Sequence, residues 1–184
     1  MKKRGRLFVI SGPSGTGKGT VLKELLKKRN DLWISVSATS RMPREGEADG
    51  VNYFFLSKDE FERKIDEQAF LEYANFCDNY YGTPKKYVEE KMENGINVIL
   101  EIEVNGAMQV KKSFPQAVLI FVLPPSIEEL RERLSGRGTE EKDVIEKRLD
   151  AAKWEISMAD RYDYRVINAT VSDAVSEIDE IIEN

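Results

Sequence analysis

The chain has 184 residues, a length that fits one well-buried core but is short for two full domains. Apolar residues make up 41% and charged residues 33%, which is typical of a globular protein and excludes general disorder. The formal net charge of −5 argues against nucleic acid as a partner, because a surface that neutralises many phosphates normally carries a basic excess. One cysteine and no histidine exclude internal disulfides, Cys/His zinc sites and an imidazole base.

Taken in chain order, short apolar runs alternate with amphipathic helical patterns. The runs that fit buried parallel strands lie at residues 7–10, 97–102, 118–123 and 164–167. Helices are expected at residues 20–29, about 84–94, 105–114, 126–135, about 144–160 and 176–182. This alternation predicts an α/β fold with a parallel sheet. The first apolar run is too short for a signal-peptide core or a membrane span, so we expect a cytoplasmic protein with no membrane partner.

Two stretches interrupt this alternation. Between residues 33 and 82, short aromatic runs surround a helix that Ser57 would cap, which indicates a small mixed lobe inserted in the core. Residues 136–139 read Gly-Arg-Gly-Thr and precede four charged residues and a long helix, and we predict a mobile lid there. Trp33, Trp154 and Cys77 are expected to be buried structural residues.

Residues 12–20 read GPSGTGKGT and nearly match the phosphate-binding pattern G-x-x-x-x-G-K-[ST], with Gly19 in place of the usual hydroxyl residue. A strand precedes this loop and a helix follows it, so free N–H groups and the positive end of the helix dipole would face a phosphate. Lys18 would reach the β- and γ-phosphates. The alternative is a simple strand-to-helix turn, but such a turn gives no reason for three glycines and a lysine.

Gly19 removes one hydroxyl ligand for Mg²⁺ but leaves a backbone N–H for the phosphates. Thr20 can offer a hydroxyl one residue later, and Mg²⁺ is often held mainly by substrate phosphates and water. Glu101 and Glu103 lie two residues apart at the end of a strand, where α/β sheets bind ligands. We expect Glu101 to hold metal-bound water and Glu103 to help bind a base, the alternative being an exposed acidic strand end.

A second motif runs from Thr39 to Phe55. It fits T-[ST]-R-x-x-[KR]-x-x-[DE]-x-x-G-x-x-Y-x-[FY] at every fixed position, and this pattern is the guanylate kinase signature. Together with the phosphate loop, Tyr80–Thr83 and Gly136–Thr139, it makes the chain resemble the guanylate kinase family over nearly its whole length. One departure is Glu103, where the family usually has aspartate. Another is Ala169, which stands where an acidic residue is common.

The resemblance implies a three-layer P-loop NTPase core with a parallel sheet, an inserted small mixed GMP-binding lobe and a helical lid. One guanylate-kinase-like domain would span residues 1–184. Its core would be residues 1–32, 84–124 and 161–184, its GMP-binding lobe residues 33–83, and its lid about residues 125–160. The implied reaction transfers the γ-phosphoryl group of ATP to GMP, giving GDP and ADP with Mg²⁺, as part of purine nucleotide metabolism. The resemblance leaves a monomer and a homo-oligomer equally open.

The resemblance also assigns residues to three roles. Those implied to take part in phosphoryl transfer are Lys18, Arg41, Arg137 and Arg148. Those implied to bind ATP are Gly12, Pro13, Ser14, Gly15, Thr16, Gly17, Lys18, Gly19, Thr20, Arg133, Arg137 and Asn168. Those implied to bind GMP are Ser37, Arg41, Arg44, Tyr53, Glu72, Tyr81, Thr83 and Glu103, with Glu101 as a metal ligand through water.

Physical chemistry supports the GMP residues independently. Two arginines three residues apart suit a phosphate dianion, because guanidinium groups pair bidentately with its oxygens. Guanine offers N1–H and amino donors beside an O6 acceptor, so its pocket needs a carboxylate and a hydroxyl. The GMP phosphate is already ionised, so transfer needs no general base, which fits a chain without histidine.

Two other functions stay open at this point. A guanylate-kinase-like binding module would use the fold to hold a phosphorylated peptide, but such modules tend to have eroded phosphate loops. A kinase for another nucleotide such as AMP is the second alternative. Glu72 and Ser37 argue against it, because adenine has no N1–H to donate to the carboxylate.

Overall fold

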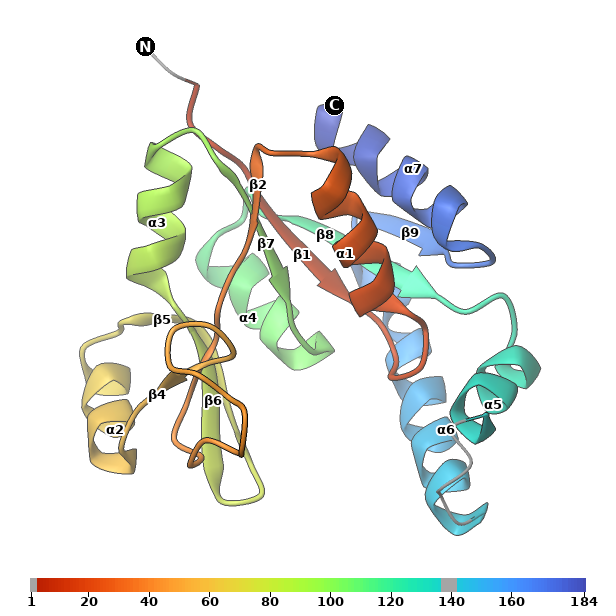
Figure 1. The fold of residues 1–184 in the computed structure, drawn as a ribbon, viewed down its shortest axis with the longest axis horizontal. Helices are drawn as coiled ribbons and strands as arrows, with labels where there is room; N and C mark the ends of the chain where they lie inside the picture. Colours follow the sequence, from red (N-terminus) through yellow and green to blue (C-terminus); the bar gives the residue numbers. More distant parts are fainter. Residues whose placement is uncertain (1–2, 137–141) are drawn as a thin grey trace. The chain divides into compact units, whose positions relative to one another are not determined.

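The computed structural model describes residues 3–136 and 142–184, and its strands form two separate sheets (Figure 1). The larger sheet has the order β2-β7-β1-β8-β9, and its β2–β7 and β8–β9 pairs are parallel. Its strands are β1 (Leu7–Ser11), β2 (Leu32–Ile34), β7 (Asn97–Glu101), β8 (Val118–Leu123) and β9 (Tyr164–Ile167). The smaller sheet has the order β4-β3-β6-β5 and is mixed. Its strands are β3 (Ala38–Thr39), β4 (Phe54–Phe55), β5 (Phe70–Phe76) and β6 (Asn79–Pro84).

The contacts within the chain divide it into two compact units. Unit 1 consists of Met1–Phe8 and Asp31–Ala117, and unit 2 of Val9–Asn30 and Val118–Asn184. The helices of unit 1 are α2 (Lys58–Asp66), α3 (Lys85–Glu93) and α4 (Val104–Ser113). Those of unit 2 are α1 (Lys18–Lys28), α5 (Ile127–Ser135), α6 (Lys142–Ser157), the short 3-10 helix η1 (Ala159–Arg161) and α7 (Val171–Glu183). In the described part of the chain, no helix is long and apolar enough to cross a membrane.

The small sheet of unit 1 has an aromatic core of its own. Phe61 of α2 is fully buried and stacks on Phe70 and Tyr80, with ring centroids 4.3 and 5.2 Å apart. The capping box at Ser57, which the sequence predicts, is present and fixes the start of α2. Strands β5 and β6 form an antiparallel hairpin whose turn residues, Cys77 and Asp78, both have positive φ.

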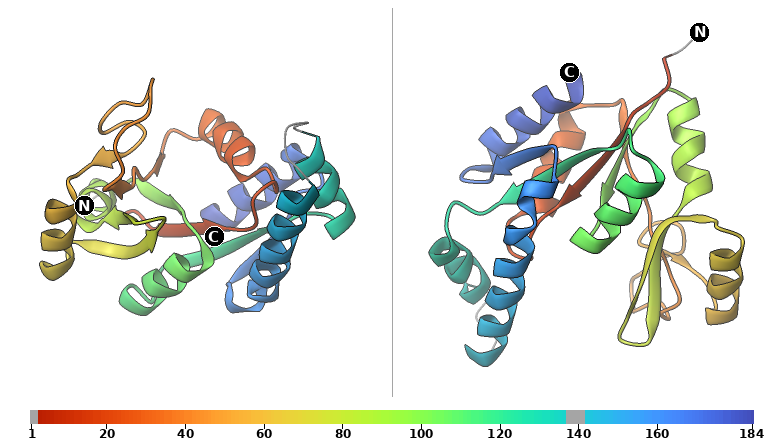
Figure 2. Two further views of the ribbon diagram at one scale, coloured as in Figure 1. Left: turned by 90° about the horizontal axis from the view of Figure 1, so that it is seen from below. Right: turned by 180° about the vertical axis from the view of Figure 1, so that it is seen from behind.

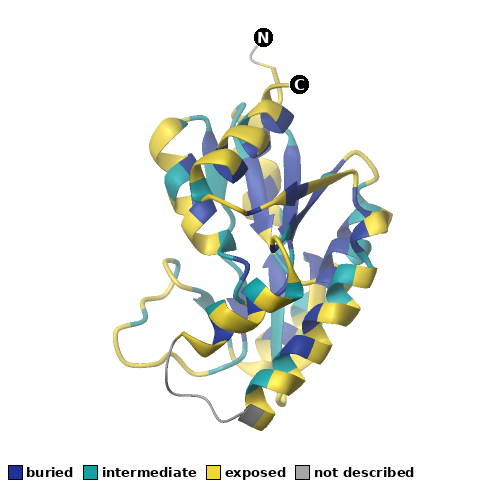
Figure 3. Cartoon of the chain, turned by 90° about the vertical axis from the view of Figure 1, so that its right-hand side faces the viewer, coloured by how far each residue is buried: buried dark blue, intermediate teal, exposed yellow. Residues whose placement is uncertain are grey.

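Unit 2 contains the glycine-rich loop, which lies between β1 and α1. Helix α7 packs against α1 and β9 and buries one of its faces, as the alternating blue and yellow of Figure 3 shows. Arg29 and Asp179 form an ion pair at 2.8 Å between α1 and α7. Helices α5 and α6 share a separate apolar cluster of Leu130, Leu134, Leu149 and Ala152.

The structure confirms the predicted parallel strands and the expected helices to within a few residues at each end, apart from α7. Strand β2 was not predicted, because only three residues form it. Helix α7 begins at Val171, five residues before the expected start, with Thr170 as its cap. The predicted burial of two residues is wrong, because Trp154 is 48% exposed and Cys77 is exposed at the hairpin turn. Trp33 is half-buried. Residues 137–139 of the predicted hinge lie outside the described residues.

We predict that Phe61→Ala lowers the free energy of unfolding by about 3–5 kcal/mol, because it leaves a cavity between two stacked rings. The matched control is Phe76→Ala, which removes a phenyl ring that is 68% exposed, and should change stability by only about 0.5 kcal/mol. Urea unfolding of both variants measures the difference. Equal losses in the two variants would contradict this picture of the aromatic core.

Candidate active site

The glycine-rich loop of unit 2 needs glycine at its closest approaches. A Cβ atom on Gly12, where φ is 148°, would lie 2.2 Å from the Val122 carbonyl oxygen. Gly17 has φ 85° and precedes α1, and a Cβ there would lie 2.7 Å from Nδ2 of Asn168. The backbone can therefore wrap tightly at these positions only because no side chain intervenes. The loop closes on itself through Thr16, whose hydroxyl donates to the Pro13 carbonyl oxygen at 2.8 Å.

The first turn of α1 presents its N–H groups without competition from an anion. Among the described residues, no side chain caps this helix and its first turn contains no acidic residue. A bound phosphate would be attracted by the N–H groups and the helix dipole together. The ammonium of Lys18 lies over the loop and donates to the carbonyl oxygens of Gly12 and Pro13 at 2.5 and 3.0 Å. Gly19 is exposed, and a Cβ atom there would have no neighbour within 4 Å.

Two residues predicted to bind ATP, Asn168 and Arg133, and one predicted to take part in phosphoryl transfer, Arg148, contact this loop from elsewhere in unit 2. Asn168 is buried and donates from Nδ2 to the Thr16 carbonyl oxygen at 2.6 Å. Arg133 donates to the Asn168 carbonyl oxygen at 3.0 Å, and Arg148 donates to the Ser14 hydroxyl at 2.7 Å. The structure therefore gathers two of the predicted arginines beside the glycine-rich loop. The other predicted arginine of this half, Arg137, lies outside the described residues.

A second polar cluster lies in unit 1, around Arg41. Its guanidinium donates to Glu47 Oε1 at 2.9 Å and to the Met42 carbonyl oxygen at 2.7 Å. It also lies over the ring of Tyr53, 5.5 Å from the ring centroid, and Tyr53 packs edge-on against Tyr81 at 6.1 Å. The hydrogen bond with Glu47 raises the pKa of Arg41, and burial opposes this increase. A hydrogen bond with Tyr81 raises the pKa of Arg41 by a smaller amount. A fixed cation with two tyrosines beside it suits a phosphate.

Glu47 is the residue of this cluster to which the sequence analysis gave no role. One carboxylate oxygen accepts from the Arg41 guanidinium, and the other accepts from the Arg44 backbone N–H at 2.7 Å. The hydrogen bond from Arg41 and then that from Arg44 lower the pKa of Glu47, so it is held as a carboxylate. Arg44 itself is exposed. The acidic position in the signature motif was the available signal, because its fixed spacing from both arginines suggests an ion pair.

Glu72 is the buried carboxylate of unit 1. It is 6% exposed and lies opposite Thr83 in the β5–β6 hairpin. The Thr83 hydroxyl donates to Glu72 Oε1 at 2.6 Å. Burial raises the pKa of Glu72, the Thr83 hydrogen bond opposes this, and the nearby negative charge of Glu103 raises it further. Tyr81 and Thr83 are two residues apart on β6, so their side chains share a face of the small sheet. The Arg41 cluster and the buried carboxylate therefore belong to one sheet.

The remaining predicted residues of unit 1 lie at element ends. Ser37 is half-buried just before β3. Glu101 is the last residue of β7 and is exposed. Glu103 is exposed and precedes α4 as its N-cap residue, without a capping hydrogen bond from its side chain. Glu101 and Glu103 thus lie at the carboxyl end of β7, as expected.

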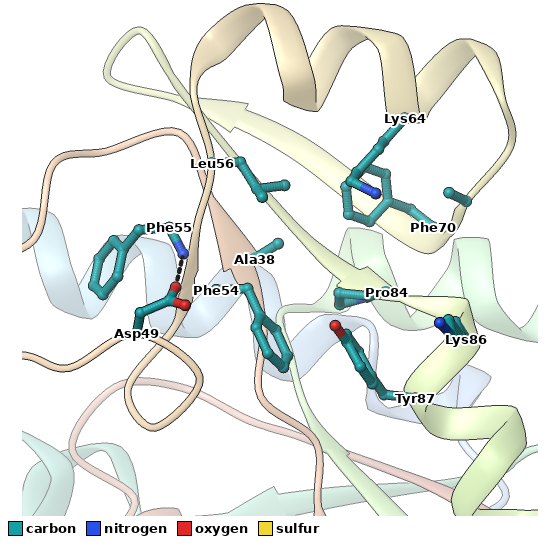
Figure 4. A pocket seen from close by; sticks show the side chains of 11 residues that line it. Ala38, Asp49, Phe54, Phe55, Leu56, Lys64, Phe70, Pro84, Lys86 and Tyr87 are labelled. Carbon is teal, nitrogen blue, oxygen red and sulfur yellow. Dashed lines mark hydrogen bonds between the residues drawn. The ribbon is translucent and has the colours of Figure 1, made fainter.

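A pocket of about 360 Å³ is also present in unit 1, but it contains none of the predicted site residues. Figure 4 shows some of the residues that line it, among them Ala38, Phe54, Phe70, Lys64 and Tyr87. Phe54 stacks on Tyr87 with ring centroids 4.5 Å apart. Residues next to Phe54 and Ala38 in sequence, Tyr53 and Thr39, point to the other face of the strands. The pocket thus contains none of the predicted site residues, although one of its walls, Phe55, lies under the Arg41 guanidinium, 5.8 Å from the ring centroid.

Comparison with known proteins decides the family. Residues 4–184 match the protein family described as guanylate kinase. The chain belongs to the guanylate kinase family. The guanylate kinase of Caldanaerobacter subterraneus subsp. tengcongensis is 54% identical over 182 residues, covering 99% of this chain and 88% of that protein. The guanylate kinase of Prochlorococcus marinus subsp. pastoris is 49% identical over 184 residues, covering 100% of both.

A solved structure supports the same family. The crystal structure of guanylate kinase from Anaplasma phagocytophilum superposes with a TM-score of 0.76 at 32% identity, covering 99% of this chain and 86% of that one. Within this guanylate kinase family member, the described residues predicted for ATP lie in unit 2, and those predicted for GMP lie in unit 1.

We predict that Glu72→Gln gains stability relative to the wild type as the pH rises. Because the pKa of Glu72 is raised in the folded chain, the folded state keeps this proton to higher pH than the unfolded state does. The stability from this group is therefore present at low pH and is lost as the pH rises through the raised pKa. Glutamine does not ionise and keeps an acceptor for Thr83. Each pKa unit of the shift corresponds to about 1.4 kcal/mol.

Urea unfolding at about pH 5 and about pH 8 measures this difference. The control is Glu67→Gln, which alters an exposed carboxylate of the same unit and should show the same difference from wild type at both pH values. A Glu72→Gln advantage that shrinks with rising pH would contradict the assignment.

Proposed function

We propose that this chain transfers the γ-phosphoryl group of ATP to GMP, with the glycine-rich loop and its arginines binding ATP and the small sheet binding GMP. The reaction, which gives ADP and GDP, is that of the guanylate kinase family. The observation that carries the proposed division is the buried Glu72–Thr83 pair, which lies on the same small sheet as the Arg41–Tyr53–Tyr81 cluster. A base reader and a phosphate binder on one sheet suit a nucleoside monophosphate.

Guanine would replace the hydrogen bond between Thr83 and Glu72. Thr83 has one hydroxyl proton, and in this structure it goes to Glu72. Guanine N1–H and the 2-amino group would take its place on the carboxylate. The Thr83 proton, together with that of Ser37, would then be available to O6, and Glu103 would assist at the base. Adenine lacks the N1–H and the 2-amino group, so the buried carboxylate would keep only its hydrogen bond from Thr83, and a buried charge with too few donors is heavily penalised.

The phosphate of GMP would bind at the Arg41 cluster. Arg41, Arg44, Tyr53 and Tyr81 supply two cations and two hydroxyl donors for a dianion. Glu47 keeps the Arg41 guanidinium in place before the phosphate arrives. Because the GMP phosphate is itself the nucleophile and is ionised near neutral pH, the chain has to position it and neutralise charge rather than remove a proton.

The triphosphate of ATP would bind at the loop in unit 2. Backbone N–H groups from Gly12 to Thr20, except at Pro13, which has none, would face its β- and γ-phosphates. Lys18 would exchange its loop carbonyl partners for phosphate oxygens. Arg133 and Arg148, which already contact loop residues, would stabilise the charge of the transferred group, as would Arg137. Asn168 would hold the loop and contact the adenine side.

The chemistry of the donor groups fits Mg²⁺, which prefers oxygen ligands and keeps several waters. When bound, Mg²⁺ supplies charge neutralisation at the phosphates. The open space at Gly19 leaves room beside the loop, and Thr20 is exposed and offers a hydroxyl on the α-phosphate side. Glu101 is exposed and would act through water. The domain and lid boundaries, the cytoplasmic location and the absence of a nucleic-acid partner stay predictions of the sequence.

We expect Lys18→Ala to lower GMP-dependent ADP release by roughly 10²–10³-fold, the usual loss when one charge-stabilising donor is removed. The control is Lys23→Ala, which removes an exposed lysine from the same helix and should keep full turnover. ADP release from ATP and Mg²⁺ is measured with GMP or AMP as acceptor. In a folded wild type that binds GMP, no turnover with any acceptor would overturn the kinase assignment and favour a binding module.

Glu72→Ala should lower the preference for GMP over AMP by about tenfold or more, because the carboxylate no longer distinguishes N1–H from a bare nitrogen. The measurement is kcat/KM for each acceptor. Glu67→Ala, in the same unit, is the matched control and should keep the wild-type preference. An unchanged preference in Glu72→Ala would refute its role as base reader.

Gly19→Ser should leave turnover within about tenfold of the wild type, a change of about 1.4 kcal/mol in activation free energy. A serine side chain fits, because a Cβ atom at this position meets no neighbour within 4 Å. The reason for the small effect is that phosphates and water hold most of the metal in either chain. Steady-state turnover at varied Mg²⁺ tests this. A gain in turnover of much more than tenfold would contradict the prediction and show that Gly19 limits the rate of the wild type.

A further inference from the structure

Strand β5, which contains Glu72, is the last strand of the small sheet and has β6 on one side only. Helix α4 packs along β5 (Figure 2). Here the Gln109 side chain takes the position of a missing strand. Its Oε1 accepts from the Tyr73 backbone N–H at 3.1 Å, and its Nε2 donates to the Tyr73 carbonyl oxygen at 3.0 Å. One side-chain amide thus satisfies both backbone groups of the residue that follows Glu72.

The backbone just before Glu72 in the chain is irregular. Phe70 pairs with Pro84 and Glu72 with Thr83, so one residue, Leu71, is extra on β5 and forms a bulge. A bulge changes the direction in which the following side chain points. Ser113, at the end of α4, lies near this bulge, with its hydroxyl 3.4 Å from the Leu71 carbonyl oxygen. Helix α4 therefore contacts the chain both before and after Glu72.

Helix α4 also approaches the carboxylate itself. Gly106 is buried in its first turn, and a Cβ atom there would lie 2.8 Å from Glu72 Oε2. Thr83 bonds the other carboxylate oxygen, Oε1. The carboxylate thus lies between the Thr83 hydroxyl on one side and, on the other, helix α4 at Gly106, where no side chain projects. The positive end of the α4 dipole favours the negative charge at this place.

We propose that Gln109 and Gly106 are positioning residues that set the direction of the Glu72 carboxylate and so determine selectivity for guanine. This inference rests on the proposed function of Glu72 as base reader. Gln109 fixes the strand directly after the bulge, and Gly106 leaves the space in which Oε2 lies. Both act on the substrate only through Glu72. A purely structural role for Gln109, covering an exposed strand edge, would alter stability without altering the choice of base.

Inosine monophosphate is the sharpest probe of this difference. It keeps O6 and N1–H but lacks the 2-amino group, so the preference for GMP over inosine monophosphate reports whether the carboxylate reaches that group. Gln109→Ala should lower this preference about tenfold and raise KM for GMP, while KM for ATP stays within about twofold. Gly106→Ala should do the same, because its methyl group displaces Oε2. Gln116→Ala, an exposed glutamine just after α4, is the matched control and should behave as wild type.

A double-mutant cycle tests the route of the effect. Equilibrium binding of GMP and of inosine monophosphate is measured for Gln109→Ala, Glu72→Ala and the double variant. We expect Gln109→Ala to change the ratio of the two dissociation constants in the wild-type background and to leave it unchanged when Glu72 is already absent. Equal effects in both backgrounds, or a loss of stability with an unchanged ratio, would overturn the inference.

The same experiments separate this inference from the proposed function. If Glu72→Ala leaves the preference for GMP over AMP and over inosine monophosphate intact, the base-reader role fails and the inference fails with it. If Glu72→Ala abolishes the preference but Gln109→Ala and Gly106→Ala keep it, the proposed function stands and only the inference is overturned. If Gln109→Ala does not fold, Gly106→Ala supplies the decisive ratio, because it keeps both hydrogen bonds to Tyr73.

Discussion

A carboxylate removed from water constrains unit 1, the part of the chain that we propose binds GMP. Glu72 is almost fully buried, and its ionised form is disfavoured until hydrogen-bond donors surround it. The neighbourhood is arranged accordingly, with a hydroxyl on one oxygen, a glycine beside the other and a helix N-terminus close by. This arrangement leaves the carboxylate incompletely satisfied, and a base that brings two N–H donors would relieve it. If the proposed role of Glu72 holds, the binding energy for guanine is partly prepared before the nucleotide binds.

The two proposed phosphate-binding groups, one in each unit, would bind phosphate by different physical means. In unit 2 the ligands are mainly backbone groups, which are rigid, uncharged and available only because the glycines allow a tight turn. In unit 1 they are side chains, and their long, flexible arms must be held in place by Glu47 and by aromatic rings. The first solution needs little beyond a local sequence motif. The second also needs contacts between side chains, such as those of Arg41 with Glu47 and Tyr53, within a longer motif.

The same distinction explains what the sequence could predict. The glycine-rich loop, the capping box at Ser57 and the buried parallel strands depend on neighbouring residues, and all were predicted. The Gln109 contact could not be predicted, because it joins α4 to β5 across 36 residues of sequence. The bulge at Leu71 could not be predicted either, because it depends on how β5 pairs with β6. The burial of Trp154 and Cys77 was predicted wrongly. The prediction used residue type alone, whereas exposure depends on which face of the helix carries Trp154 and on the place of Cys77 at a hairpin turn. Local features that depend on fixed spacing were predictable, whereas contacts between elements distant in sequence were not.

The hairpin turn at Cys77 has a practical consequence. The chain has one cysteine, and that thiol is exposed at the tip of the β5–β6 hairpin, on the strand pair that carries Glu72 and Thr83. Two molecules can therefore join through a disulfide in an oxidising buffer, and a dimer seen without reductant says nothing about native association. The same thiol accepts a single maleimide dye without any engineered cysteine. A fluorophore placed there would report on the hairpin while nucleotides bind.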